Sequence, residues 1–142
     1  MTSRAPRRLA ASARRLEEPL YAALRVIAGL NLATHGAQKL FGWFAKAPAD
    51  DRQIWVGGVI ELVTGLLIGI GLYTRPAAFL AAGTMAVAYF QYHFKFDFAA
   101  WHWAPVVNKG ELAVIYCFVF LFFVARGDGP YSVTARLGGR GG

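Results

Sequence analysis

IWVGGVIELVTGLLIGIGL, from Ile54 to Leu72, is the stretch that decides the fold, because it is apolar along its whole length except for one carboxylate. About 20 helical residues cross the hydrocarbon core of a bilayer, so this stretch is long enough to do so. Its only charged residue, Glu61, stands near the middle, where an ionisable side chain must be neutral or paired. The sequence therefore predicts a membrane-spanning helix with one structural or functional carboxylate.

Three further stretches have a similar composition and are predicted as membrane helices: residues 19–44, 76–93 and 106–125. The last contains an unbroken apolar run from Leu112 to Ala125, and it needs Val106 and Val107 to reach the far side. The alternative is a compact soluble all-α domain, but 56% hydrophobic and 16% charged residues in a chain of 142 argue against it. We predict an all-α polytopic membrane protein, a four-transmembrane-helix bundle.

The domain organisation follows from these spans. Residues 1–18 are predicted as a disordered basic tail, 19–126 as the membrane domain and 127–142 as a C-terminal tail. A basic start before an apolar stretch is also typical of a cleavable signal peptide. Arg25, Asn31 and His35 interrupt the apolar centre that such a peptide needs, so we favour a retained first helix.

Basic residues predict the orientation, because short cytoplasmic flanks of membrane helices collect Lys and Arg. Five arginines precede the first span, Arg75 lies in the second connection, and three arginines follow the last span. Both termini are therefore predicted to be cytoplasmic, in a multi-pass protein of the cell membrane. The formal net charge of +7 is explained by orientation and anionic lipid, and no motif indicates a nucleic-acid partner.

Ionisable residues gather toward the outer end of every predicted span. At about 1.5 Å per residue, His35 and Glu61 lie at a similar depth, roughly 13 and 10 Å below the outer surface. The candidates for an outward-facing polar cavity are Asn31, His35, Lys39, Glu61, Tyr89, His93 and Glu111. His35 and Glu61 are the candidate proton relay, and the other five are candidate binding residues. Arg25 lies toward the inner side and is predicted to be a structural ion pair or an anchor.

Most of these residues also have a plainer interpretation. Glu111 follows Asn108 by three, which is the spacing of a helix-capping box. Lys39 could extend to lipid head groups, and His93 could be an interfacial residue. Tryptophans at the outer helix ends and loop are predicted to form an interfacial belt: Trp43, Trp55, Trp101 and Trp103. Glu61 shares one side of its helix with Gly57, Gly65 and Gly69, a row that predicts a close helix–helix seam and favours a homo-oligomer or complex subunit.

Three segments together resemble the DoxX family of small four-helix membrane proteins: HGAQKLFGWF at 35–44, GGVIELVTGLLIGIGLYTRPAA at 57–78, and NKGELAVIYCFVFLFF at 108–123, followed by RGDGPYS. The likeness covers about residues 20 to 132. It includes the motif positions His35, Gly36, Lys39, Phe41, Gly42, Gly58, Glu61, Gly65, Thr74, Arg75, Pro76, Gly110 and Glu111. Some relatives are subunits of a thiosulfate:quinone oxidoreductase, and others are membrane partners in complexes that handle oxidative or thiol stress, so the resemblance implies a redox protein partner.

Two functions remain open at this point. The cavity could bind a quinone head group or a small oxyanion in a quinone-linked oxidoreductase system, with histidine and carboxylate moving protons. Alternatively, the protein has no chemistry and serves as a membrane anchor or assembly factor for a redox or stress-response complex. Haem is disfavoured, because His35 and His93 differ in estimated depth by roughly a dozen ångströms. No spacing indicates a metal site, and Cys117 has no second cysteine with which to form a dithiol.

Overall fold

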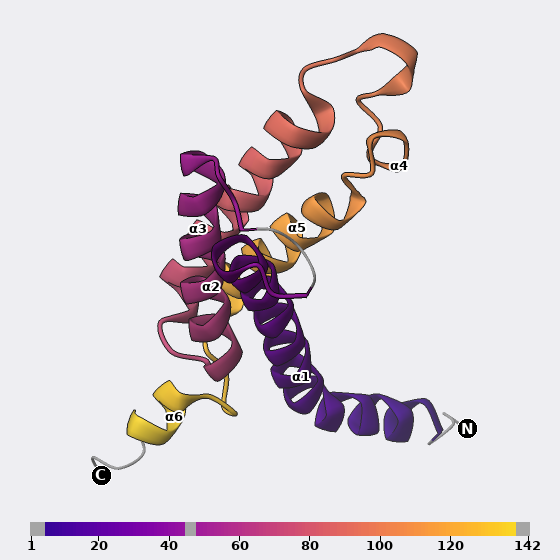
Figure 1. Cartoon of the computed structure of the whole chain (residues 1–142). Helices are drawn as coiled ribbons and strands as arrows, with labels where there is room; N and C mark the ends of the chain where they lie inside the picture. Colours follow the sequence, from indigo (N-terminus) through magenta and orange to yellow (C-terminus); the bar gives the residue numbers. More distant parts are fainter. Residues whose placement is uncertain (1–4, 45–47, 139–142) are drawn as a thin grey trace.

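The computed structural model describes residues 5–44 and 48–138, and within them every regular element is a helix, which confirms the all-α class (Figure 1). The elements are α1 (Ala5–Phe41), α2 (Arg52–Ile70), α3 (Thr74–Ala88), the π-helix η1 (Tyr89–Phe94), the short 3-10 helix η2 (Ala99–Trp101), α4 (Pro105–Asn108), α5 (Glu111–Arg126) and α6 (Val133–Gly138).

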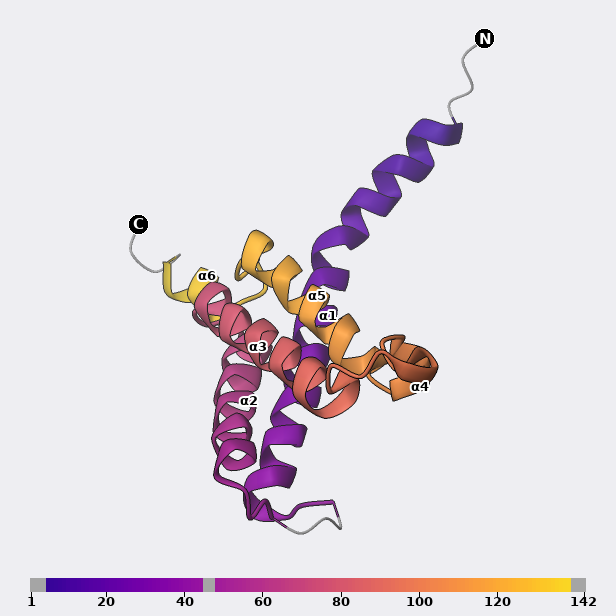
Figure 2. The ribbon, with the colours of Figure 1, turned by 90° about the horizontal axis from the view of Figure 1, so that it is seen from above.

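The long helices pack in sequence order. α1 packs along α2, α3 packs along α5, and α2 contacts α3, so that two helix pairs meet through α2 and α3. Figures 1 and 2 show this arrangement from two directions, with η1 and α4 at one end of the molecule. In Figure 1 the two described ends of the chain both lie at the opposite end.

The stretch that decides the fold forms α2, and its ends follow from local chemistry. The Asp51 carboxylate accepts hydrogen bonds from the backbone amides of Gln53 at 2.8 Å and Ile54 at 3.0 Å, which satisfies two free donors of the first turn. Gly71 ends the helix with a φ of 72°, in the left-handed region that glycine adopts without a Cβ clash. The tight turn to α3 follows directly.

One helix is long and apolar enough to cross a membrane by its own length and composition within the described part of the chain. It is Arg52–Ile70, with a mean hydropathy of 1.8. α3 has 15 residues and α5 has 16, although α3 continues without a break into η1.

The first helix begins earlier than the sequence predicted. α1 starts at Ala5 rather than near residue 19, so most of the expected disordered tail is helical, while residues 1–4 lie outside the described part. Pro19, the first residue of the predicted span, lies inside the helix. Residues 9–18 are rich in alanine, leucine, arginine and glutamate, which are good helix formers. Proline bends a helix without always ending it, and the N-terminal part of α1 runs at an angle to the rest in Figure 1.

The fourth predicted helix is divided. The stretch expected to run from 106 to 125 forms α4, which contains Val106 and Val107, and then α5 from Glu111. Lys109 separates them with a φ of 59°, which a continuous helix does not allow. The Asn108 side chain accepts a hydrogen bond from the Gly110 amide at 2.8 Å and stabilises this turn. The two valines therefore do not extend α5.

Small residues on α3 allow the aromatic residues of α5 to approach it. Ala78 and Ala81 are fully buried, and so are Phe120 and Phe123 of α5 and Ile68 of α2. Tyr116 stacks on Phe120, with ring centroids 5.5 Å apart. These residues belong to the core, to which α1 adds Tyr21, Ala28 and Leu32.

A segment after α5 closes the end of the molecule near the termini. The Tyr21 hydroxyl donates to the Gly127 carbonyl, and the Thr74 amide donates to the Asp128 carboxylate at 2.9 Å. Arg25 is 1% exposed and donates to the carbonyls of Ile68 at 2.8 Å and Tyr131 at 2.6 Å. Arg25 thus joins α1 to the end of α2 and to the segment after α5 through backbone carbonyls. Its predicted role as an ion pair or an anchor stays a prediction.

Candidate functional site

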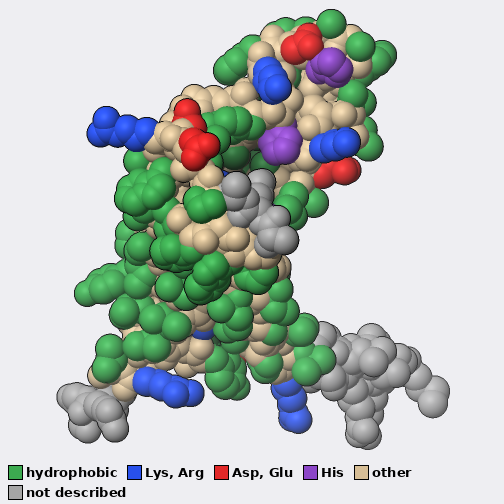
Figure 3. All heavy atoms as spheres, in the orientation of Figure 1, with side chains coloured by type: hydrophobic (Ala, Val, Ile, Leu, Met, Phe, Trp, Pro, Cys, Tyr) green, Lys and Arg blue, Asp and Glu red, His purple; other side chains and the backbone are tan. Residues whose placement is uncertain are grey.

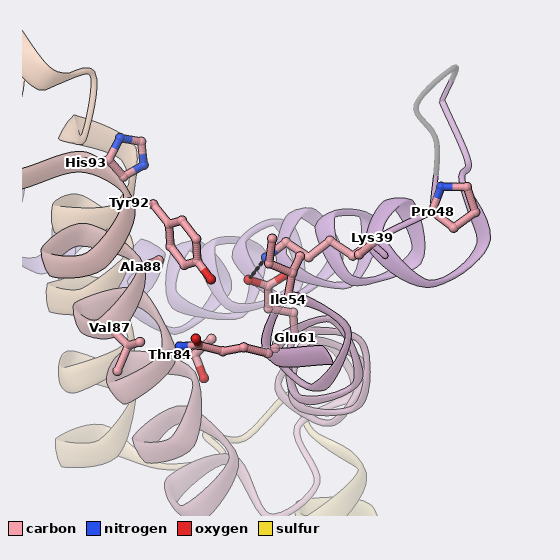
Figure 4. A pocket seen from close by; sticks show the side chains of 12 residues that line it. Lys39, Pro48, Ile54, Glu61, Thr84, Val87, Ala88, Tyr92 and His93 are labelled. Carbon is pink, nitrogen blue, oxygen red and sulfur yellow. Dashed lines mark hydrogen bonds and ion pairs between the residues drawn. The ribbon is translucent and has the colours of Figure 1, made fainter. Parts of the chain in front are cut away.

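A cavity of about 530 Å³ lies where the end of α1, the following loop, α2, α3 and η1 come together (Figure 4). Its walls mix apolar with polar side chains: Lys39, Pro48, Ala49, Gln53, Ile54, Gly57, Glu61, Thr84, Val87, Ala88, Tyr92 and His93. Ligand cavities commonly have volumes of about 300 to 1,000 Å³ and a few polar groups in an apolar lining. The predicted polar cavity therefore has a counterpart in the structure, with three of its predicted residues.

Lys39 and Glu61 form the polar centre of this cavity. The Lys39 ammonium donates to Glu61 Oε1 at 2.6 Å, across the contact between α1 and α2. The Glu61 side chain is 2% exposed, whereas that of Lys39 is 30% exposed. A buried carboxylate is costly unless it is paired, and Lys39 provides the partner. Lys39 therefore turns into the protein and does not extend to lipid head groups, and its side chain stays partly exposed.

His35, the predicted relay partner of Glu61, is not in this cavity. It is exposed and lines a separate small hollow with Thr34, Gln38 and Phe44. Asn31, one turn earlier, is also exposed. The side of α1 that faces α2 carries Gly29, Ala33 and Gly36, which points Asn31 and His35 in another direction. The rise per residue estimates a depth for His35, but it carries no information about the direction of the side chain around the helix.

The π-helix η1, which continues α3, carries polar residues of which some line the cavity and others do not. Tyr92, which sequence reasoning did not select, and His93 line the wall, and Figure 4 shows the Tyr92 hydroxyl pointing toward the Lys39–Glu61 pair. Tyr89 points elsewhere and donates to the Trp103 carbonyl at 2.7 Å. A π-helical turn is wider than an α-helical turn and shifts which residues share a face, so a regular 3.6-residue pattern does not identify Tyr92.

Asn108 holds the loop above the cavity in place. Its amide donates to the carbonyl of His102 at 2.7 Å and to the Tyr89 hydroxyl at 3.3 Å, and its own carbonyl lies 3.2 Å from His93 Nδ1. The predicted capping box with Glu111 is wrong, because α5 begins at Gly110 without a side-chain cap. Glu111 is exposed and does not line the cavity. The Asn-Lys-Gly turn was the available signal for this role of Asn108.

The loop from 95 to 104 carries one titratable contact outside the predicted spans. His102 Nδ1 lies 2.5 Å from the Asp97 carboxylate. This hydrogen bond, with a second from the Ala99 amide, lowers the pKa of Asp97 below its ordinary value. The carboxylate thus stays ionised in the fold at a pH where it would already be protonated in the unfolded chain.

We therefore expect His102→Ala to raise the pKa of Asp97 toward about 3.9, the ordinary value. The pKa of Asp97 is lower in the folded protein than in the unfolded chain. The contact therefore stabilises the loop fully at pH values above the ordinary pKa, and this stabilisation is lost as the pH falls through the lowered pKa. Carbon-detected NMR titration of the Asp97 carboxyl measures the shift. An unchanged pKa in the variant would show that the Ala99 amide alone holds the carboxylate.

The polar residues of the cavity wall are acid–base and hydrogen-bonding groups. Within residues 5–44 and 48–138, no cluster of three His, Cys, Asp or Glu residues could hold a metal ion. His35 and His93 line different hollows, so this arrangement does not offer them as a facing pair of haem ligands. Cys117 is half-buried on α5. The site can bind a polar head group beside an apolar wall and exchange protons with it.

Comparison with known proteins agrees with the resemblance in the sequence. The sequence model of the DoxX family matches residues 20–94. An uncharacterized protein of Haemophilus influenzae is 35% identical over 119 residues, which cover 80% of this chain and 87% of that protein. No solved structure is significantly similar to the chain. The family match covers more than half of the sequence and includes Lys39, Glu61 and His93, and on these grounds the chain belongs to the DoxX family of membrane proteins.

Proposed function

We propose that this protein crosses the cell membrane four times, through α1, α2, α3 with η1, and α5, with both termini in the cytoplasm. Figure 3 supports this proposal, because hydrophobic side chains cover the middle of the face in view, and charged side chains gather at its two ends. Large apolar residues are exposed on each of these helices, for example Ile27, Val63, Phe79 and Phe118. Lipid is the environment in which such surfaces are stable.

We further propose that the cavity binds the head group of a quinone, and that the protein is a subunit of a quinone-linked oxidoreductase system. The observation that carries this proposal is the partly exposed Lys39 side chain in the cavity wall, whose ammonium lies 2.6 Å from Oε1 of the buried Glu61. An ammonium group has three N–H donors, and Glu61 Oε1 accepts from one of them. The others can donate to a quinone carbonyl, with the ring against Ile54, Val87 and Ala88.

The same pair gives a route for a proton. Quinone reduction takes up two protons and two electrons, and the ligand would contact Lys39, with Glu61 directly behind it. The second oxygen of Glu61, Oε2, is buried without a hydrogen-bond partner among the described residues, so the contact with Lys39 leaves one acceptor of this carboxylate unused. The electrons must come from a redox protein partner, because the cavity supplies acid–base groups. The predicted role of His35 in the relay stays a prediction, and the cavity does not support it.

We expect Lys39→Met to weaken binding of a short-chain ubiquinone by about tenfold to a hundredfold, because a hydrogen bond from a charged group contributes about 1.5–3 kcal/mol. Glu61→Gln keeps the shape but removes the acidic group, so we expect it to retain binding and to abolish quinone-linked activity once the partner is present. Native mass spectrometry of the gently solubilised full chain measures bound quinone. Lys95→Gln is the matched control, because Lys95 is exposed and does not line the cavity.

A second candidate function is a non-catalytic membrane anchor or assembly factor for a redox or stress-response complex. The observation that favours it is that Lys39–Glu61 joins α1 to α2 beside a seam of glycines, where an ion pair also stabilises the helix pair. The two functions separate on the same variants. An anchor binds no quinone and loses assembly in Glu61→Gln, which leaves no unpaired carboxylate. A quinone-binding subunit with this substitution assembles and keeps quinone binding but loses activity. A bare homo-oligomer that holds only lipid would favour the anchor.

A further inference from the structure

His93 has one ring nitrogen whose protonation state the fold determines. Its Nδ1 lies 3.2 Å from the backbone carbonyl of Asn108, and a carbonyl oxygen can only accept a hydrogen bond. Nδ1 must therefore carry a proton to make this contact. In the neutral imidazole, the other nitrogen, Nε2, then has a free lone pair and acts as an acceptor.

The Asn108 carbonyl is itself held in position. The Asn108 side chain bonds Gly110, His102 and Tyr89, which come from α5, the loop and η1. The Tyr89 hydroxyl in turn donates to the Trp103 carbonyl at 2.7 Å. This network fixes the carbonyl relative to η1, so it fixes the orientation of the His93 ring as well as its tautomer.

His93 Nε2 has no hydrogen-bond partner among the described residues, and His93 is half-buried in the wall of the cavity. Figure 4 shows His93 on one side of the cavity and Lys39 coming from the other, with Tyr92 between them. The two ends of the site therefore differ in chemistry. Lys39 can only donate hydrogen bonds, whereas Nε2 of the neutral His93 can only accept one.

We infer that the cavity distinguishes a quinol from a ligand of the same shape without hydroxyl groups, because His93 Nε2 accepts a hydrogen bond from a ring hydroxyl while Lys39 donates to the other ring oxygen. This inference rests on the proposed quinone site and adds a specificity for its reduced, diol form. It gives His93, one of the predicted binding residues, the role of hydrogen-bond acceptor in the cavity.

The test compares two probes on the full-length, detergent-solubilised protein under anaerobic conditions. One probe is decylubiquinol, and the other is its 1,4-dimethyl ether, which keeps the ring oxygens but has no hydroxyl to donate. We expect the protein to bind the diol about tenfold more tightly than the ether, the effect of one hydrogen bond. Native mass-spectrometric titration gives both affinities.

The variants separate the two nitrogens of His93. In His93→Asn the side-chain amide stands near the position of Nδ1 and can still donate to the Asn108 carbonyl, but the acceptor is lost. We expect the diol-to-ether ratio to fall to about 1 in this variant, while binding of oxidised decylubiquinone shows that the cavity is intact. His93→Gln places an amide oxygen near Nε2 and is expected to retain part of the preference. His35→Gln is the control, and it should keep the full ratio.

The results that overturn the inference differ from those that overturn the proposed function. A ratio near 1 in the original protein, or a full ratio in His93→Asn, contradicts the role of His93 while quinone binding stands. Loss of oxidised quinone binding in both His93 variants assigns His93 a merely structural role and also contradicts it. If the original protein binds neither probe nor the oxidised quinone, the quinone site itself is wrong.

Discussion

Replacing Arg25 by methionine is expected to prevent the protein from accumulating in a folded form. The guanidinium donates to the carbonyls of Ile68 at 2.8 Å, Gly69 at 3.3 Å and Tyr131 at 2.6 Å. The first two belong to the last turn of α2, where the helix dipole favours a positive charge. The Ile68 carbonyl also accepts from the Gly71 amide at 3.1 Å, so Arg25 is its second donor. The third belongs to the segment after α5, so this side chain joins distant parts of the chain.

The size of the effect follows from burial. Arg25 is 1% exposed, so water cannot replace its hydrogen bonds when it is removed. The Ile68 carbonyl keeps the Gly71 amide as a donor, whereas the carbonyls of Gly69 and Tyr131 lose the Arg25 guanidinium. A buried polar group left unpaired costs about 1–3 kcal/mol, and domains have only about 5–15 kcal/mol of stability. We expect a loss of about 3 kcal/mol or more, visible as aggregation on solubilisation or as a large drop in the midpoint of thermal unfolding. Methionine fills a similar volume, which limits the contribution from a cavity.

Arg136→Met is the matched control, because Arg136 is exposed and lies near the same end of the chain. It should leave the unfolding midpoint within the range of ordinary surface substitutions, about 0.5 kcal/mol. Arg25→Lys retains the charge but not the fork of donors, and we expect an intermediate loss. If Arg25→Met unfolds at the same temperature as Arg136→Met, the three carbonyl contacts do not stabilise the fold.

The buried charged residues Glu61 and Arg25 show what the sequence could and could not predict. Composition identified α2 and the need for a partner for Glu61, because both follow from the cost of charge in an apolar segment. Lys39, one of the predicted cavity residues, bonds Glu61 at 2.6 Å. The partners of Arg25 were not predictable, because every residue has a backbone carbonyl and the sequence does not show which ones face Arg25. The direction of the His35 side chain around its helix was also not predictable, since it depends on how the helices pack.

Helix boundaries were the least predictable part of the fold, for local reasons. The first span was predicted to begin at residue 19, but Pro19 lies inside α1. The break between α4 and α5 depends on the positive φ of Lys109 and on the hydrogen bond between Asn108 and Gly110. Similarly, the π-helical turn of η1 turns Tyr92 into the cavity wall against the regular period. Each of these features results from a few hydrogen bonds that tertiary contacts decide, so a pattern averaged over several turns cannot show them.

The contact between α1 and α2 leads to the second large prediction, because it depends on glycine. A Cβ added at Gly65 would lie 2.5 Å from the Ala33 amide nitrogen and 2.6 Å from the Gly29 carbonyl oxygen. A Cβ added at Gly29 would lie 2.6 Å from the Gly65 carbonyl oxygen. These neighbours are backbone atoms, which cannot rotate away as a side chain can. The seam predicted from the row of glycines on α2 thus includes Gly65, but Gly57 of the same row meets nothing within 4 Å.

We expect Gly65→Ala to destabilise the protein by about 1–3 kcal/mol, the usual cost of one extra carbon in a closely packed contact. The two helices must separate, and that movement also pulls Lys39 on α1 from Glu61 on α2, so the variant should lose quinone binding together with stability. Thermal unfolding of the solubilised protein, followed by circular dichroism, measures the first effect, and native mass spectrometry measures the second.

Gly69→Ala is the matched control for Gly65→Ala. It adds the same carbon one turn later on the same helix, where a Cβ meets nothing within 4 Å. Alanine is the better helix former by about 1 kcal/mol, so this variant should be neutral or slightly more stable. The two substitutions are chemically identical and differ only in what faces them, so opposite signs would mean that the close approach of α1 and α2 decides the result. If both variants lose stability equally, the glycines of α2 matter for the helix itself, and the ion pair of the cavity does not depend on this seam.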